Sequence, residues 1–299
     1  MPKKNVKHSP YSRSEKQITR WLEEQKRGTG HGLEYIPGLY TNEIESAKKN
    51  NFKERVSGIK ACGRDMQLAS HTEHRILRFF DLAKNVVEIR EQFPLKRSVT
   101  LGIAEKLKIQ HPSQTDYNTE KPFAIYMTTD FLVTLLDKSN QEYLVAVSVK
   151  PVSELQDKRV LEKQKIEYVY WSLRGVRFVI ITDLSFKSAV SDNLELIHQS
   201  YCTMEQNEVS LPGNVNIALI EAHILSAIKS ESGAITISEL CKKIRLFSGY
   251  RLLCNENWPK ALIYNAFRKL LAKYCQALPQ EDSSLIYEIS SLQYEKSQK

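Results

Sequence analysis

Two short apolar runs separated by turn-forming residues constrain the fold of this chain more than any other feature. The first, Thr129–Val133, and the second, Leu144–Lys150, are rich in residues with high strand propensity. Between them, Asp137–Gln141 supplies polar residues that commonly form turns, so the pattern predicts an antiparallel hairpin. A lysine at the end of an apolar strand is costly to bury without an anion. We therefore expect Lys150 to meet Asp130 on the neighbouring strand.

Alternation along the second run determines which side chains accompany the lysine. Successive side chains of a strand point to opposite faces, so Ser148 and Lys150 share one face while Val149 lies on the other. An aspartate and a lysine in this relation are a weak signal by themselves, because a lysine at the end of a strand is usually solvated. The interpretation therefore depends on the elements that surround the hairpin.

The segments around the hairpin indicate an α/β domain. Periodicity predicts, in chain order, a helix over 71–82, a strand over 86–95, the hairpin, a helix over 153–173 and a strand over 176–183. Glu73 falls in the first turn of the first helix, where the helix dipole favours an acid, and Glu167 falls on the second helix. In this order the last connection is a crossover between parallel strands, which is right-handed in nearly all proteins.

A carboxylate and a lysine that converge at the edge of a sheet resemble the site of PD-(D/E)xK nucleases. The order of the predicted elements likewise resembles the restriction-endonuclease-like core. In such sites the carboxylate holds a divalent metal ion, and the lysine orients or activates the attacking water.

Several motifs that follow one another in the first part of the chain carry a more specific resemblance. They are Gly30–Pro37, Val87–Leu95, Thr129–Val133, Val149–Pro151, Leu155–Asp157, Leu161–Lys163 and Tyr170–Trp171. Their sequence and order are similar to those of the TnsA family, the endonuclease subunits of heteromeric bacterial cut-and-paste transposases. The resemblance implies catalytic acids at Glu73 and Asp130, a catalytic lysine at Lys150 and a further glutamate of the site at Glu167.

The same resemblance implies a metal site built from oxygen ligands. The family uses, around its metal ion, the residue two before the lysine and the carbonyl just before it, which here are Ser148 and Val149. The family pattern has glutamine where this chain has Ser148. The serine side chain is shorter and its oxygen is a weaker ligand, so a bridging water is expected there. Two carboxylates, Glu73 and Asp130, with the Val149 carbonyl favour Mg²⁺ or Mn²⁺ over zinc. Glu167 is then expected to orient Lys150 or a metal-bound water.

The function implied by the resemblance is hydrolysis of the 5′ (non-transferred) strand at each transposon end in double-stranded DNA. The family works with a DDE transposase, TnsB, which cuts and joins the 3′ ends, and with an AAA+ ATPase, TnsC, which activates both. Two alternatives remain. A stand-alone restriction or repair nuclease would cleave without partners, whereas a non-catalytic DNA-binding scaffold would tolerate loss of Glu73, Asp130 or Lys150.

Composition is compatible with these expectations. A net charge of +8 and a pI near 9.1 fit a polyanionic partner, although many proteins are mildly basic. Five cysteines without a CxxC spacing predict buried thiols in a reducing cytosol. The chain has no apolar run long enough to cross a membrane and no signal-peptide core, so we expect a cytoplasmic bacterial protein that joins the nucleoid when active.

The length of 299 residues and a change of character after Asp183 predict two domains. Residues 1–185 would form the nuclease domain, preceded by a basic helical arm over 14–27 that is capped by Ser14 and either contacts DNA phosphates or is solvated. Residues 186–299 would form a smaller winged-helix-like domain for partner docking and DNA contact. Its expected elements are helices over 215–230, 236–248 and 258–274 and a strand over 285–289.

Overall fold

The computed structural model describes residues 13–43 and 53–185, together with Leu194, Glu195, His198 and Ser226. Its α-helices are α1 (Glu15–Glu23), α2 (His71–Leu82), α3 (Arg97–Leu107) and α4 (Lys158–Ser172), and its 3-10 helices are η1 (Gly32–Glu34), η2 (Thr41–Glu43), η3 (Ile59–Ala61) and η4 (Val152–Gln156). Its strands are β1 (Glu54–Ser57), β2 (Asp65–Leu68), β3 (Val86–Pro94), β4 (Ser113–Thr115), β5 (Pro122–Ala124), β6 (Thr128–Leu136), β7 (Glu142–Lys150) and β8 (Arg177–Thr182). The predicted winged-helix-like domain lies outside the described residues.

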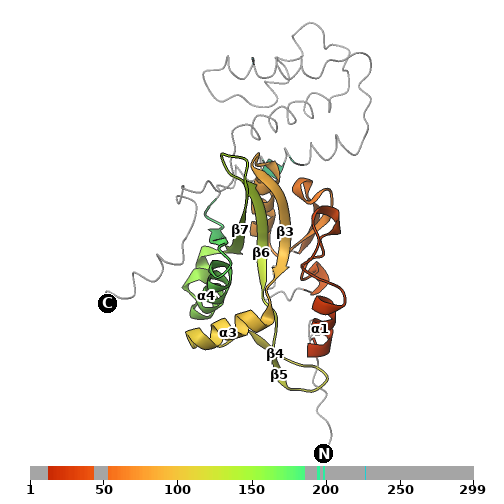
Figure 1. Ribbon diagram of the computed structural model, residues 1–299, viewed down its shortest axis with the longest axis vertical. Coiled ribbons are helices and arrows are strands. Elements are labelled where there is room, and N and C mark those ends of the chain that lie inside the picture. Colours follow the sequence, from red (N-terminus) through yellow and green to blue (C-terminus); the bar gives the residue numbers. More distant parts are fainter. Residues whose placement is uncertain (1–12, 44–52, 186–193, 196–197, 199–225, 227–299) are drawn as a thin grey trace, which may run out of the picture. The chain divides into compact units, whose positions relative to one another are not determined.

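A four-stranded mixed sheet in the order β3-β6-β7-β8 forms the centre of the described part (Figure 1). β6 and β7 are the predicted hairpin, paired antiparallel with Phe131 opposite Val147, and β3 pairs antiparallel with the free edge of β6. β7 and β8 run parallel, with Lys150 opposite Thr182, as the helix between them requires. The α/β fold class is therefore confirmed.

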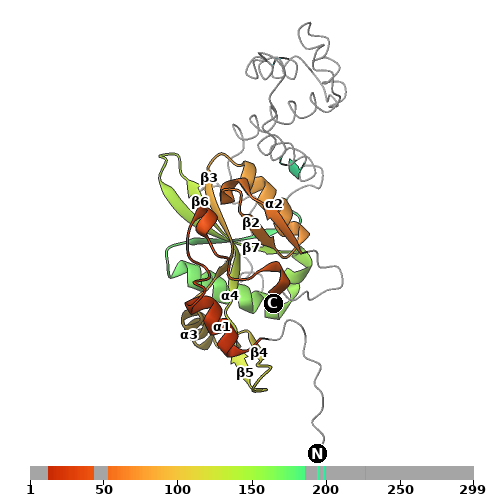
Figure 2. The same cartoon turned by 90° about the vertical axis from the view of Figure 1, so that its right-hand side faces the viewer.

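Helices cover both faces of this sheet. α3 and α4 lie together on one face in Figure 1, where Ile166 and Trp171 of α4 pack in one buried cluster with Leu132 of β6 and Ile180 of β8. α2 lies on the other side in Figure 2, and its Phe80 meets Phe131 of β6 with the ring centroids 6.3 Å apart. Phe131 and Leu132 are neighbours that point to opposite faces, which is the alternation expected of a strand buried on both sides.

Local capping explains where the two helices of the site begin. The Ser70 hydroxyl accepts a hydrogen bond from the Glu73 N–H (3.2 Å), a capping arrangement that starts α2 at the predicted position. α4 begins at Lys158 rather than near residue 153, which corrects the predicted boundary. The Asp157 carboxylate caps it by accepting from the N–H groups of Arg159 and Val160, and the preceding residues form η4 instead.

The basic N-terminal arm is shorter and better anchored than expected. Ser14 caps α1 as predicted, but the helix ends at Glu23, and Arg27 folds back into the protein. The Arg27 guanidinium forms two hydrogen bonds to the Glu43 carboxylate, at 2.6 and 2.9 Å, and lies over the Trp21 ring. Because Arg27 is buried and paired, it is not available for DNA phosphates.

The glycine-rich segment after α1 is a turn that docks on β3. Glu88 of β3 accepts hydrogen bonds from the Gly32 N–H (2.7 Å) and His31 Nδ1 (2.9 Å). Gly28 has a φ of +84°, and a Cβ added there would collide with the Pro94 ring, so only glycine fits this close approach. The motifs at 30–37 and 87–95 are thus two halves of one packing interaction.

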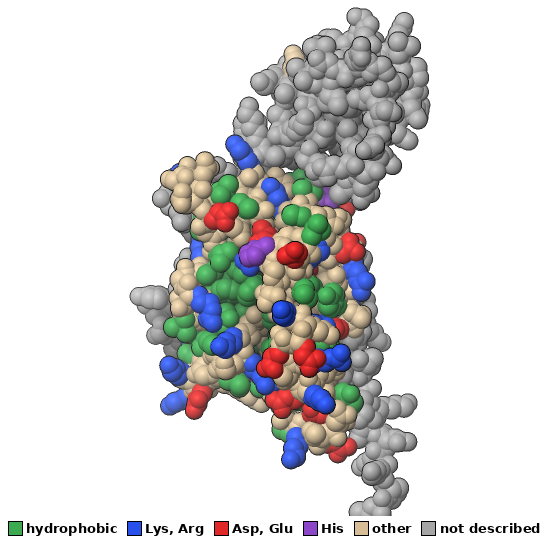
Figure 3. All heavy atoms as spheres, turned by 45° about the vertical axis from the view of Figure 1, so that its right-hand side comes forward, with side chains coloured by type: hydrophobic (Ala, Val, Ile, Leu, Met, Phe, Trp, Pro, Cys, Tyr) green, Lys and Arg blue, Asp and Glu red, His purple; other side chains and the backbone are tan. Residues whose placement is uncertain are grey.

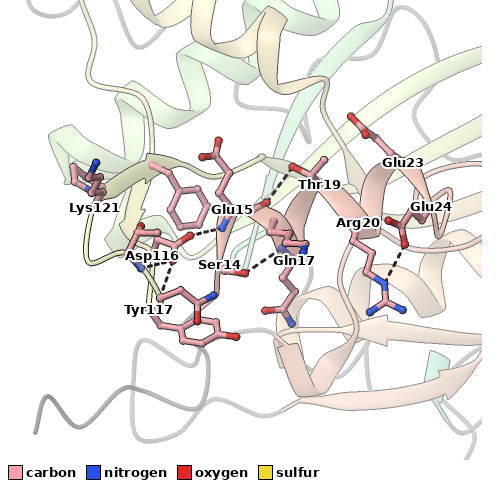
Figure 4. A pocket seen from close by; sticks show the side chains of 15 residues that line it. Ser14, Glu15, Gln17, Thr19, Arg20, Glu23, Glu24, Asp116, Tyr117 and Lys121 are labelled. Atoms are coloured by element: carbon pink, nitrogen blue, oxygen red, sulfur yellow. Dashed lines mark hydrogen bonds and ion pairs between the residues drawn. The ribbon is translucent and has the colours of Figure 1, made fainter.

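A hollow between α1 and the β4–β5 hairpin lies apart from the acid–lysine hairpin in the sequence (Figure 4). Its centre is organised by Asp116, which accepts a hydrogen bond from the Glu15 N–H at 2.7 Å. Acidic and basic side chains alternate along its lining, with Glu23 and Glu24 near Arg20. This mixed lining gives the hollow no single charge that would select a polyanion.

Two smaller findings concern the surface. Cys62 is exposed and carries a free thiol, so the expectation of a buried thiol is wrong there. It follows η3 with a left-handed backbone (φ 56°) that turns the chain at the surface, and the other cysteines lie outside the described residues. Among the described residues no helix has the length and apolar character needed to span a bilayer.

Candidate active site

The centre of the site is the contact between Asp130 of β6 and Lys150 of β7. Asp130 Oδ2 accepts hydrogen bonds from Lys150 Nζ at 3.0 Å, from the Val149 N–H at 2.6 Å and from the Ser148 hydroxyl at 3.2 Å. Lys150 Nζ also donates to the Val149 carbonyl at 2.7 Å. The predicted meeting of Asp130 with Lys150 is therefore present. The ammonium lies between the Asp130 carboxylate and the Val149 carbonyl, two oxygens that the family resemblance implies as metal ligands.

This pair is accessible as well as ordered. The side chains of Lys150 and Asp130 are 23% and 14% exposed, so a phosphate group can reach them from solvent. Partial burial alone would lower the pKa of Lys150, but the carboxylates of Asp130, Glu167 and Glu73 outweigh it and raise that pKa above 10.5. Lys150 is consequently an ammonium cation at neutral pH and has no free electron pair with which to act as a base.

Glu73 approaches the pair from α2. Its carboxylate accepts hydrogen bonds from the Ala69 N–H (2.9 Å) and the Ser70 hydroxyl (3.0 Å), which fix it at the helix N-terminus. Burial and then the negative charge of Asp130 raise the pKa of Glu73 from 4.5 to about 7, against the opposing effects of the Ala69 hydrogen bond and Lys150. Glu73 therefore lies within electrostatic reach of both members of the pair.

Glu167 approaches from α4, on the opposite face of the sheet. The Trp171 indole N–H donates to Thr129 Oγ1 at 2.8 Å, and Thr129 Oγ1 lies 2.7 Å from Glu167 Oε1. An indole N–H can only donate, so the threonine hydroxyl accepts that hydrogen bond. The same hydroxyl donates its own hydrogen bond to the Glu167 carboxyl group. Burial and then Asp130 raise the pKa of Glu167 to about 8, and Glu167 is mainly protonated at neutral pH.

The structure thus brings Asp130, Ser148, Val149 and Lys150 into direct contact and places Glu73 and Glu167 on either side of them. Glu167 was expected to orient Lys150 or a metal-bound water, and its hydrogen bond goes to Thr129 instead of to Lys150. The catalytic and metal-binding roles expected for these six residues remain predictions.

Sequence reasoning assigned no role to three further residues at this site. Thr129 and Trp171 link β6 to Glu167, and Gln164 is buried one helical turn before Glu167. The signal for Trp171 and Gln164 was their spacing from Glu167, since residues three and four apart share a helix face. For Thr129 the only signal was its position next to Asp130.

The cation-binding capacity of the site comes from mixed oxygen donors. Within the ranges 13–43 and 53–185, no three histidine, cysteine, aspartate or glutamate side chains are grouped so as to hold one ion. However, Asp130 Oδ2 and the Val149 carbonyl already hold one cation, the Lys150 ammonium. Carboxylate and carbonyl oxygens are also the donors preferred by hard divalent ions.

The mixed sheet, with a carboxylate and a lysine joined across a hairpin and acids on both flanking helices, defines an α/β domain of the nuclease type. Residues 83–183 match the model of a family described as TnsA-like endonuclease N terminal. The chain is also 33% identical over 264 residues to the Transposon Tn7 transposition protein TnsA of Escherichia coli, covering 85% of this chain and 89% of that protein. The chain belongs to the TnsA family of endonucleases, and its class of reaction is the hydrolysis of phosphodiester bonds.

Proposed function

We propose that this protein is a divalent-metal-dependent DNA endonuclease that cuts the 5′ (non-transferred) strand at each transposon end. The observation that supports this proposal best is the convergence of Asp130, the Val149 carbonyl and Lys150 at one accessible point, between Glu73 and Glu167. Membership of the TnsA family gives the reaction class, and the similarity to a transposition protein gives the biological process.

The residues present fit a Mg²⁺ or Mn²⁺ ion. Asp130, Glu73 and the Val149 carbonyl would hold it. Burial raises the pKa values of Glu73 and Glu167 first and the negative charge of Asp130 raises them second, and a cation would relieve this second effect. When bound, such an ion supplies Lewis acidity and lowers the pKa of water. The Ser148 hydroxyl already donates to Asp130, which makes it a weaker candidate ligand.

The side chains of the protein divide the remaining work. Lys150, which stays charged, stabilises the negative charge that develops on the scissile phosphate or positions the attacking water. Asp130 holds the ammonium in place through its 3.0 Å contact. Glu167, mainly protonated near neutral pH, can keep or release a proton beside them, and Thr129 fixes the carboxyl orientation.

The proposed partners are a TnsB-like DDE transposase, which would process the 3′ strands, and a TnsC-like AAA+ ATPase, which would activate both enzymes. The charge distribution does not by itself mark a path for DNA. On the face shown in Figure 3, basic and acidic side chains are interspersed, although the whole chain carries a net charge of +8. We therefore expect the partner proteins, together with this chain, to position the transposon end.

The experiment uses a labelled transposon end, the partner proteins and three versions of this chain: wild type, Asp130→Ala and the control Lys138→Ala. Lys138 is an exposed residue in the hairpin turn. The Asp130 variant should lose 5′-strand cleavage while 3′ chemistry continues, which converts simple insertions into cointegrates, and the control should cut normally. Normal cutting by Asp130→Ala would refute the site. Efficient cutting by the wild type without any partner would instead indicate a stand-alone restriction or repair nuclease.

A further inference from the structure

One buried polar atom of α4 has no partner. Gln164 is only 3% exposed, and its Oε1 atom accepts no hydrogen bond from any described residue. A buried amide oxygen without a donor or a cation is unfavourable, and native proteins rarely keep one without a reason. The orphaned oxygen therefore indicates a ligand or a water at this position.

Gln164 shares a face of α4 with Glu167, whose pKa responds to burial, to Asp130 and to Lys150. It precedes Glu167 by three residues and Trp171 by seven, which places the three side chains along one face of the helix. Glu167 and Trp171 both hydrogen-bond Thr129, the neighbour of Asp130. The adjacent Lys163 has its pKa lowered first by burial and then by the charges of Arg159 and Lys150, so this turn of α4 lies within the field of Lys150.

The strand position next to the acid–lysine pair offers little oxygen to a metal ion. The Ser148 hydroxyl is short and already donates a hydrogen bond to Asp130 at 3.2 Å. No three acidic, histidine or cysteine side chains of the described residues can hold an ion by themselves, so neutral oxygens must contribute. An amide oxygen is a suitable ligand for Mg²⁺ or Mn²⁺, either directly or through a water.

We propose that the unpaired amide oxygen of Gln164 is a neutral oxygen ligand of this site, reaching the metal ion directly or through a water. The ligand would come from helix α4, while the Ser148 hydroxyl of strand β7 stays bonded to Asp130. This inference rests on the proposed function, because it presumes a divalent ion at Asp130 and the Val149 carbonyl. It adds Gln164 to the site residues Glu73, Asp130 and Lys150.

The test measures binding of Mn²⁺ alone to the full-length protein, by electron paramagnetic resonance of the free ion, without DNA and without turnover. Gln164→Leu removes the amide at similar volume, and the exposed Gln141 of the hairpin turn provides the matched control, Gln141→Leu. Gln164→Leu should weaken Mn²⁺ binding at least about tenfold, as loss of a ligand or of its support typically does. The double variant Ser148→Gln/Gln164→Leu should recover most of that affinity.

The alternatives give different results. If Gln164 is only a packed core residue, Gln164→Leu keeps its Mn²⁺ affinity and raises the melting temperature by removing an unpaired buried amide, which would overturn the inference. Failure of Ser148→Gln to restore binding would also overturn it. Asp130→Ala separates the two proposals: if it loses Mn²⁺ while Gln164→Leu does not, only this inference fails. If wild type binds Mn²⁺ no better than Asp130→Ala, the metal site and the inference fail together.

Discussion

Replacing Glu167 with glutamine is expected to stabilise the protein, and the gain should grow as the pH rises. Glu167 is 3% exposed, and burial followed by the charge of Asp130 raises its pKa from 4.5 to about 8. Between these values the folded protein keeps a proton that the unfolded chain has lost, so the free energy of unfolding falls with increasing pH. At about 1.36 kcal/mol for each pKa unit, the penalty is roughly 3 kcal/mol at pH 7 and about 5 kcal/mol above pH 8.

Glutamine removes this penalty with little change in shape. Its amide oxygen can still accept the hydrogen bond from the Thr129 hydroxyl, which lies 2.7 Å from Glu167 Oε1, so the link to Trp171 survives. The difference in the free energy of unfolding between Glu167→Gln and wild type should therefore be near zero at about pH 4.5 and increase up to about pH 8.

The assay is urea unfolding of the full-length protein in EDTA at pH 5, 7 and 8.5. Glu105→Gln, at an exposed position of α3, serves as the matched control and should show no such slope. A stability difference for Glu167→Gln that is the same at pH 5 and pH 8.5 would refute the raised pKa. A variant less stable than wild type at pH 8.5 would show that the charged carboxylate is favoured in the fold.

Further predictions concern the hairpin and the domain boundary. Asp130→Ala and Lys150→Ala should both abolish 5′ cleavage. Asp130→Ala should weaken Mn²⁺ binding, whereas Lys150→Ala should strengthen it, because Lys150 Nζ is bonded to Asp130 Oδ2 and to the Val149 carbonyl. Weaker Mn²⁺ binding by Lys150→Ala would contradict this. Ser148→Ala should be milder than Asp130→Ala and Ser148→Gln should be tolerated, whereas a Ser148→Ala variant without activity would make the hydroxyl a required ligand. Proteolysis between residues 185 and 191 should give two folded pieces. In a pull-down the C-terminal piece should retain the ATPase partner. Retention by the N-terminal piece alone would assign the docking role to the nuclease domain.

The sequence alone determined the parts of this protein that depend on neighbours along the chain. The hairpin followed from two alternating strands around a turn, and the meeting of Asp130 with Lys150 followed from its register. Glu73 could be placed in the first turn of α2, and Ser14 could be identified as the cap of α1, because caps act within three residues. These features require no knowledge of what packs on the sheet.

The tertiary structure decided what distant segments do to one another. α3 and the β4–β5 hairpin were not predicted. Arg27, expected either to contact DNA or to be solvated, is buried against Glu43. The link from Trp171 through Thr129 to Glu167 joins residues about forty positions apart. The raised pKa of Glu167 and the unpaired oxygen of Gln164 exist only because α4 packs against the sheet. Burial changes the free energy of charged and polar groups, and no local sequence pattern encodes that burial.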